Sequence, residues 1–450
     1  MVVPADRCFA DLAPYAAVAG RTELLEQKGR VLQVVGLVIE SSGPPARIGD
    51  LCYLLPRGGK ERVAAQVVGF QREVLLLMPL DEVEGVEPGS EIVAAGREVS
   101  VGVGRALLGR VIDGQGKPLD GGPPPLADRH YPLLAAPPSP LSRRRIKEPL
   151  DLGVRSLNAL LTCGRGQRVG IFSGSGVGKS TLLGMVARHA EARTNVVCLV
   201  GERGREVREF IERDLGAEGL QRSVVVVSTS DQPALKRLNA AFAATAIAEY
   251  FRDEGEDVLL LMDSITRVAA AQRQVGLAVG EPPATRGYTP SVFAMLPRLL
   301  ERAGTSSTGS ITGLYAVLVE GDDMNEPVAD TARSILDGHI VLSRDMAMRG
   351  VYPPVDALQS VSRLMPDLVS REHAEAAAVF RQVLACHREA EDLINIGAYV
   401  RGSNPRIDFA LEMIDGAMEF LKQSPEERVS LADAAVSLRA LFEAGGCGAG

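Results

Sequence analysis

The stretch GIFSGSGVGKSTLLGMVARH, residues 170–189, contains the pattern that decides the fold. Residues 169–173, apolar up to Phe172, predict a buried strand, and residues 180–189 predict a helix that begins where the glycine-rich loop ends. In such a strand–loop–helix unit the glycines let backbone amides face phosphate oxygens, and the helix N-terminus adds positive potential. We therefore expect a nucleotide to be bound by Gly174, Ser175, Gly176, Val177, Gly178, Lys179, Ser180 and Thr181.

Two side chains of this loop have roles of their own in the prediction. Lys179 can reach the β- and γ-phosphates, and the hydroxyl of Ser180 can bind Mg²⁺. The first position of the usual G-x-x-x-x-G-K-[ST] pattern is Ser173 instead of glycine. The alternative is a glycine-rich turn that caps an ordinary helix, but the flanking strand and helix argue against it. We expect ATP and Mg²⁺ as the ligands.

A second signal is the apolar run of residues 258–262, which ends in Asp263. A carboxylate at the carboxyl end of a buried strand holds Mg²⁺ in P-loop enzymes, usually through water. Taken alone, the pattern also fits a strand followed by a helix with Asp263 or Ser264 as its N-cap. Downstream of a phosphate-binding loop we favour the metal ligand.

A third signal is the segment GERGRE, residues 201–206, which follows a predicted strand at residues 196–200. Glu202 can polarise an attacking water molecule, and Arg203 can offset its charge or orient a phosphate. A solvated charged turn is the alternative. Further along the chain, Tyr352 can stack on adenine. Arg363 can supply positive charge to a transition state, in cis or in trans, although from residue types alone packing and surface charge are the more frequent explanation of both residues.

The arrangement of elements predicts an α/β protein. Apolar strands alternate with amphipathic helices in the middle of the chain, which indicates a parallel sheet covered on both faces. Short apolar runs between residues 30 and 101 suit a small barrel or sandwich. The C-terminal part is helical, with helices expected at residues 371–394, 408–423 and 425–443. The expected divisions are residues 1–25, 26–101, 102–365 and 366–450.

The composition limits the class of protein. The 450 residues carry a formal net charge of −8, which disfavours a non-specific nucleic-acid binder. The six cysteines are dispersed, which predicts neither a disulfide framework nor a zinc site. No apolar run reaches the roughly 18–20 residues that cross a bilayer. We expect a cytoplasmic protein that reaches a membrane only through its partners.

Residues 174–181, 201–210, 260–272 and 320–363 together resemble the type III protein export ATPases, and the flagellar branch fits best. These proteins are related to the catalytic subunit of F-type and V-type rotary ATPases. The resemblance implies a small β-barrel, then a RecA-like P-loop core, then a helical domain. It also implies a homohexamer with ATP between subunits, at the inner face of the cytoplasmic membrane. Implied partners are a regulator docking at residues 1–25, a stalk protein, export chaperones and unfolded export substrates.

The resemblance also assigns roles. It implies that Lys179 binds phosphate, that Ser180 and Asp263 hold the metal, and that Glu202 activates water. Tyr352 would stack on the adenine bound by its own subunit. The helical domain lacks the dense acidic motif of the rotary family, and the nearest run is EAED at residues 389–392, which weakens the expectation of a stalk contact.

Arg363 would reach the nucleotide of the neighbouring subunit as an arginine finger. Three alternatives remain open at this point. The chain can be a RecA-like hexameric nucleic-acid motor, a non-catalytic ring subunit, or the ATPase of a virulence injectisome instead of a flagellum.

Overall fold

The computed structural model describes residues 27–56, 61–319, 321 and 323–443. The segment 1–25, for which regulator binding is expected, lies outside the described residues. Contacts divide the chain into two units, one up to Arg97 and one from Glu98 onward.

The first unit is a six-stranded barrel, closed in the order β1-β2-β5-β4-β3-β6. Its strands are β1 (Lys28–Val35), β2 (Val38–Ser41), β3 (Asp50–Leu55), β4 (Val63–Gln71), β5 (Val74–Pro79) and β6 (Glu91–Glu98). Ile39, Leu54, Leu77 and Ile92 are fully buried inside it. The predicted small β-barrel is therefore confirmed. A turn at Gly36, where φ is 58°, separates β1 from β2, because glycine adopts this left-handed conformation without strain.

The second unit contains a nine-stranded sheet, in which β16 joins only β17 and the rest follow the order β19-β18-β12-β17-β15-β13-β14-β8. The strands are β8 (Val111–Asp113), β12 (Arg168–Ser173), β13 (Thr194–Val200), β14 (Ser223–Ser228), β15 (Asp257–Asp263), β16 (Gly304–Thr305), β17 (Ser310–Leu318), β18 (Gly338–Leu342) and β19 (Val361–Ser362). The strands from β18 to β8 run parallel, whereas β19 pairs antiparallel with β18 at one edge. Two small ladders, β7 (Ser100–Val103) with β9 (Arg129–Pro132) and β10 (Pro149–Leu150) with β11 (Cys163–Gly164), flank the sheet.

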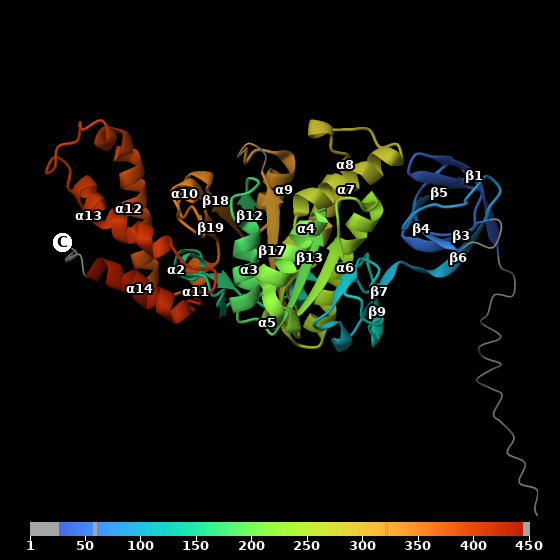
Figure 1. Ribbon diagram of the computed structural model, residues 1–450, viewed down its shortest axis with the longest axis horizontal. Coiled ribbons are helices and arrows are strands. Elements are labelled where there is room, and N and C mark those ends of the chain that lie inside the picture. Colours follow the sequence, from blue (N-terminus) through green and yellow to red (C-terminus); the bar gives the residue numbers. More distant parts are fainter. Residues whose placement is uncertain (1–26, 57–60, 320, 322, 444–450) are drawn as a thin grey trace, which may run out of the picture. The chain divides into compact units, whose positions relative to one another are not determined.

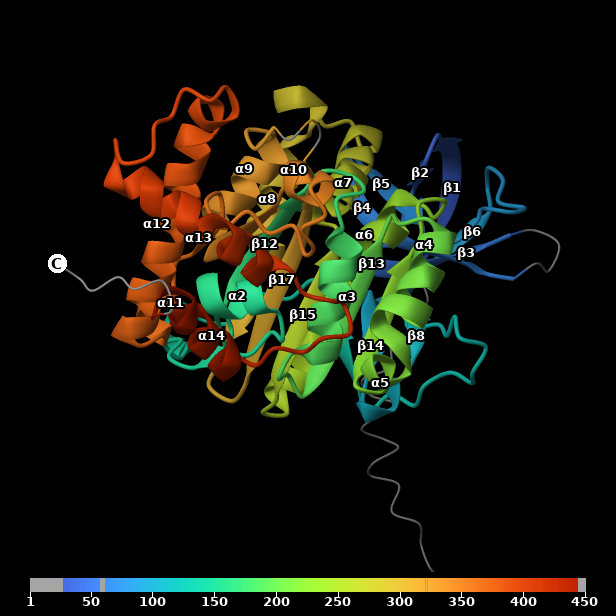
Figure 2. The ribbon, with the colours of Figure 1, turned by 60° about the vertical axis from the view of Figure 1, so that its left-hand side comes forward.

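Helices cover both faces of this sheet (Figures 1 and 2). The helices of the core are α2 (Arg155–Leu160), α3 (Lys179–His189), α4 (Gly204–Glu209), the π-helix Phe210–Leu215, α5 (Gly216–Gln221), α6 (Ala234–Asp253), α7 (Ile265–Ala278), α8 (Pro290–Leu300), α9 (Pro327–Ile335), α10 (Arg344–Met348) and α11 (Met365–Leu368). Helices α3 and α5 lie on one face, and α6 and α7 lie on the other. The predicted parallel sheet with two helical layers is confirmed.

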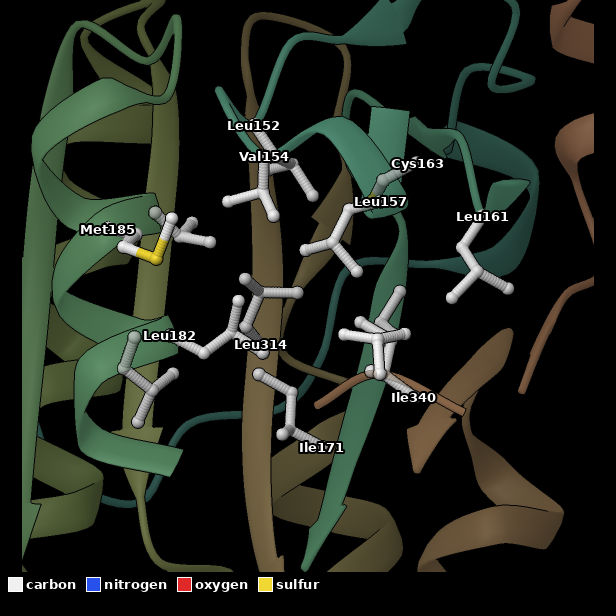
Figure 3. Packing of buried hydrophobic residues seen from close by; sticks show 14 of the residues in the cluster. Leu152, Val154, Leu157, Leu161, Cys163, Ile171, Leu182, Met185, Leu314 and Ile340 are labelled. Atoms are coloured by element: carbon white, nitrogen blue, oxygen red, sulfur yellow. The ribbon is translucent and has the colours of Figure 1, made fainter. Parts of the chain in front are cut away.

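The core beneath α3 is continuous from strand to helix (Figure 3). Ile171 of β12 and Leu314 of β17 are fully buried and face Leu182 and Met185 of α3. Ile340 of β18 extends the same layer towards α2. Burying a side chain of this size contributes about 1.5–3 kcal/mol. This packing fixes β12 and α3, and therefore the loop that joins them.

The C-terminal part consists of α12 (Arg371–Asn395), α13 (Pro405–Leu421) and α14 (Leu431–Glu443). The rings of Phe380 and Phe420 lie 5.4 Å apart between α12 and α13, and α14 packs on α2. The expected helix at residues 425–443 was wrong at its start, because α14 begins only at Leu431. The Ser430 hydroxyl accepts a hydrogen bond from the amide of Asp433 and caps the helix there. The amide of Val429 donates to Gly153 in the core, so the preceding residues follow the core surface instead of a helix.

Candidate active site

The glycine-rich loop lies where the sequence predicts it, between the last residue of β12, Ser173, and the first residue of α3, Lys179. Gly176 and Gly178 have φ values of 77° and 109°, a left-handed region that other residues adopt only with strain. Val177 is 3% exposed and anchors the loop in the core. Among the described hydrogen bonds, none uses a backbone amide of residues 174–178. These amides and the start of α3 can therefore receive an anion.

Three charged side chains meet at the carboxyl edge of the sheet. The Lys179 ammonium group forms an ion pair with Asp263 Oδ1 and lies 3.8 Å from Glu202 Oε1. The three residues come from α3 and from the ends of β15 and β13, and β15 lies next to β13 in the sheet. Parallel strands place their carboxyl ends at one edge, which is why residues far apart in sequence converge here. The Ser264 hydroxyl accepts from the amide of Arg267, so the N-cap alternative is realised beside the acidic site.

Glu202 is an unusual carboxylate for a charged turn. It is 9% exposed, and its Oε1 has no hydrogen-bond partner in the part of the chain that the structure describes. Burial raises the pKa of Glu202 to about 7, and Asp263 adds to this rise, whereas Lys179 and Arg267 act against it. A carboxyl group that titrates near neutral pH can accept a proton during turnover at physiological pH. These properties favour a catalytic role over the solvated turn.

Arg267 is a site residue that the residue-by-residue reasoning did not single out. It lies in the first turn of α7, four residues after Asp263. One nitrogen of its guanidinium, Nη1, donates to the carbonyl of Gly201, and Nη2 lies 3.3 Å from Glu202 Oε2. It therefore holds the Glu202 turn against α7. The available signal was an arginine placed one helical turn after a carboxylate at a strand end.

The residues present fit a magnesium–nucleotide complex. Ser180 is exposed at the start of α3, and Asp263 lies at the same edge of the sheet, so a hydroxyl and a carboxylate oxygen are both available there. Mg²⁺ prefers such hard oxygen ligands. The hydroxyl of Ser173, the residue that departs from the usual pattern, is buried and has no partner among the described residues.

Tyr352 is brought to the loop, and Arg203 is not brought to the charged cluster. The Tyr352 ring lies 3.8 Å from the position that a Cβ atom would take at Gly178, and the ring is about half exposed. Its backbone carbonyl accepts from the amide of Gln423, which ties it to the end of α13. The Arg203 side chain is 79% exposed and lies 3.7 Å from Glu206, so its expected contact with phosphate stays a prediction.

Arg363 lies at the other end of the sheet. It follows β19, and its amide donates to the carbonyl of Asp337, the residue before β18. Because β12 and β18 run parallel in register, Arg363 lies level with the start of β12, whereas the glycine-rich loop follows its end. The six residues of β12 span about 16 Å at roughly 3.3 Å each. The Arg363 side chain is exposed and makes one long contact, 3.4 Å, with the carbonyl of Arg333.

Within the described residues, no helix combines the length and the apolar character needed to cross a bilayer.

Three family models match successive parts of the chain. The beta-barrel domain of the ATP synthase alpha/beta family matches residues 31–96, and the nucleotide-binding domain of that family matches residues 153–362. The T3SS EscN ATPase C-terminal domain matches residues 369–440. Together these matches follow the barrel, the sheet and the terminal helices described above.

Individual proteins match over nearly the whole chain. The flagellum-specific ATP synthase of Bacillus subtilis is 55% identical over 421 residues, which cover 93% of this chain and 96% of that protein. The assembled ATPase EscN of the enteropathogenic E. coli type III secretion system has a TM-score of 0.87 and 45% identity, with 92% of this chain and 99% of EscN covered. EscN in complex with its central stalk EscO matches with the same coverage, 45% identity and a TM-score of 0.85.

Proposed function

The chain belongs to the type III export ATPases of the ATP synthase alpha/beta family, and on this premise we propose that it hydrolyses Mg-ATP in a homohexameric ring that powers or primes flagellar protein export. The observation that carries the catalytic part is the convergence of Lys179, Glu202 and Asp263 beside a loop whose amides, among the described residues, make no hydrogen bond. A structural subunit has no need of a buried carboxyl group with a pKa near neutrality.

The proposed reaction is the in-line displacement of ADP by water at the γ-phosphorus. The amides of the glycine-rich loop and the Lys179 ammonium hold the phosphate oxygens. Ser180 and Asp263 would hold Mg²⁺, which would supply positive charge against the phosphates. Glu202 orients the water and accepts its proton as the new oxygen–phosphorus bond forms and the bond to ADP breaks. Arg267 keeps the Glu202 carboxylate at this position.

The second half of the site comes, in this proposal, from a neighbouring copy of the chain. The exposed position of Arg363, at the opposite end of β12 from the loop, supports a role in trans, where the guanidinium meets the nucleotide of the next subunit. Tyr352, beside Gly178, supports adenine stacking within the subunit that holds the phosphates. An arginine finger contributes roughly 10³–10⁵ to the turnover of characterised GTPases.

The setting is also part of the proposal. The Bacillus relative is a flagellum-specific ATP synthase and shares 55% of its residues with this chain, against 45% for EscN, which supports the flagellar branch over the injectisome. We infer a stalk partner from the EscN–EscO complex. A regulator bound at residues 1–25, chaperones and unfolded export substrates complete the proposed partners, at the cytoplasmic face of the membrane.

Glu202→Gln tests the catalytic assignment. Removal of a general base lowers turnover by roughly 10²–10⁴, whereas the loop and Lys179 keep their affinity for ATP. ATP binding is measured by calorimetry, and turnover by phosphate release. Glu212→Gln is a matched control, because Glu212 is an exposed glutamate further along the chain that pairs with Arg208, four residues before it. Wild-type turnover in Glu202→Gln would remove this residue from the mechanism.

Assembly is tested by specific activity against protein concentration. If the site is completed between subunits, activity per subunit rises as rings form. The same titration with poly(C) RNA distinguishes the nucleic-acid motor, for which RNA strongly stimulates turnover. ATP binding without turnover at every concentration would identify a non-catalytic subunit.

A further inference from the structure

Hydrogen bonds fix the backbone around Arg363, although the Arg363 side chain itself is exposed. The Arg363 amide donates to the Asp337 carbonyl at 3.1 Å. The Asp337 carboxylate in turn accepts from Arg168, with Nε at 3.0 Å and Nη2 at 3.1 Å. Gly338 admits no side chain here, because a Cβ atom would lie 2.6 Å from the carbonyl oxygen of Val361. The edge strand therefore lies tightly against β18 where Arg363 leaves the sheet.

One buried side chain connects this edge to the strand that carries the glycine-rich loop. Gln167 directly precedes β12 and is fully buried. Its Nε2 donates to the Asp337 carbonyl and to the Ser362 hydroxyl, each at 3.2 Å, and its Oε1 accepts from the amide of Gly164 at 2.8 Å. The Ser362 hydroxyl donates onward to the carbonyl of Thr162 at 2.8 Å.

Gln167 thus donates hydrogen bonds to the two groups next to the Arg363 backbone, the Asp337 carbonyl and the Ser362 hydroxyl. It shares the Asp337 carbonyl with the Arg363 amide, and it holds the side chain of Ser362, the residue before Arg363. A glutamine amide with both ends satisfied in a buried place fixes relative positions closely, because losing either partner leaves a buried polar atom unsatisfied. The other end of β12 leads into the glycine-rich loop.

We propose that Gln167 is a positioning residue for Arg363, and that through β12 it sets the spacing between the two half-sites that one chain presents to its two neighbours. This inference rests on the proposed trans role of Arg363. Gln167 does not touch the nucleotide. Its effect is exerted in the adjacent active site, through the backbone from which Arg363 projects.

The first test separates kcat from KM. Gln167→Met keeps the side-chain length and removes both donated hydrogen bonds, and Ser362→Ala removes one of their acceptors. We expect a loss of kcat of roughly 10- to 100-fold for Gln167→Met, as for a catalytic group misplaced by about 1 Å, and a smaller loss for Ser362→Ala. Nucleotide affinity stays at the wild-type value in both, because the loop and Lys179 are intact.

Thr312→Val is the matched control for a general loss of packing. The Thr312 hydroxyl is buried on β17 and accepts from the amide of Gly166, one residue before Gln167; among the described hydrogen bonds, none joins it to the Arg363 segment. The Thr312→Val substitution therefore removes one hydrogen bond from the turn that contains Gln167. We expect near wild-type kcat for this variant. Equal losses in Thr312→Val and Gln167→Met, at matched ring assembly, would overturn the positioning role.

The second test assigns Gln167 to a half-site by mixing subunits. Gln167→Met mixed with Lys179→Ala regains activity, because the first variant supplies an intact loop and the second an intact Arg363. Gln167→Met mixed with Arg363→Ala regains none, because both are deficient on the same side. The reverse pattern would place Gln167 in the loop half and refute the inference.

The mixture of Arg363→Ala with Lys179→Ala is the reference. If verified mixed rings of this pair stay inactive, the trans role of Arg363 in the proposed function fails, and the inference fails with it. If this pair regains activity and the Gln167 pairs do not follow the expected pattern, only the inference fails. Ser362→Ala follows the same mixing pattern and covers the case in which Gln167→Met does not fold.

Discussion

The two ends of β12 present two different kinds of charged site. At its carboxyl end, the buried carboxylates of Glu202 and Asp263 lie beside the Lys179 ammonium group of the same chain, whose charge opposes theirs. At its amino end, the Arg363 side chain is exposed and makes, among the described residues, only a long contact with the carbonyl of Arg333, yet the backbone beneath it is fixed by buried hydrogen bonds. A charge whose partners lie in the same chain can be buried, because the partners offset its desolvation. A charged side chain whose partner lies in another subunit stays exposed to water, and the fold can fix only the backbone that carries it.

The largest expected effect comes from Arg363→Ala, which removes the exposed side of this comparison. Turnover falls by roughly 10³ or more, because the positive charge offered to the transition state is lost. ATP affinity is unchanged, since the buried cluster stays intact. Both are measured on assembled rings. Arg371→Ala is the control, because Arg371 is an exposed arginine paired with Glu375 on its own helix, and we expect it to keep full activity. Turnover at the wild-type rate in Arg363→Ala, with ATP binding also at the wild-type value, would show that the exposed arginine has no part in the reaction.

Lys179→Met changes the charged cluster at the carboxyl end of β12. Without the ammonium group, Asp263 and Glu202 face the triphosphate with no opposite charge from α3, and charge-assisted hydrogen bonds to phosphate are lost. We expect ATP affinity to fall roughly 10- to 100-fold, measured by calorimetry. Lys28→Met changes an exposed lysine of the barrel and leaves affinity unaltered. A variant that lost turnover but bound ATP normally would show that Lys179 does not hold the ground-state phosphates.

Arg267→Met tests whether the Arg267 charge lowers the pKa of Glu202. Burial and Asp263 raise the pKa of Glu202 to about 7, and the Arg267 charge acts in the opposite direction. Because the ionised form is the base, wild-type kcat/KM falls about tenfold per unit as the pH decreases below that value. Without Arg267 the pKa of Glu202 rises further, so the acidic limb moves to higher pH. Arg208→Met, at an exposed i,i+4 pair, leaves the limb unmoved. A limb that moved to lower pH would contradict the assignment.

The smallest expected effect is on stability. The pKa of Glu202 is raised on folding, so the folded state loses stability as the pH rises from the ordinary value of 4.5 to about 7 and stays at that level above. Glu202→Gln removes this loss. We expect the nucleotide-free variant to be more stable by about 1–3 kcal/mol at pH 8 and unchanged near pH 4. Thermal unfolding at the two pH values measures the difference. An equal change in stability at the two pH values would show that the charge of the Glu202 carboxylate does not cause the difference.

Much of the carboxyl-end site was readable from the sequence. Glycines followed by a lysine, an apolar run that ends in Asp263, and Glu202 two residues after another apolar run are local patterns whose spatial meaning follows from parallel strand geometry. The role of Arg267 was missed, because nothing in its own turn shows that its guanidinium reaches Gly201. The start of α14 was missed for the same kind of reason, since the amide of Val429 donates to a distant residue, Gly153.

The sequence by itself determined which chemistry is available: a phosphate-binding loop, two carboxylates at strand ends and a barrel–core–helix order. Those properties depend on neighbours along the chain, so they survive in a one-dimensional pattern. Only the tertiary structure decided that Glu202 is buried enough to titrate near neutrality and that Arg203 faces solvent. It also decided that Gln167 bonds beneath Arg363 at the far end of β12 from the loop. Burial, pKa and cross-strand hydrogen bonds depend on residues that are brought together only when the sheet and its helices assemble, and for that reason no local pattern encodes them.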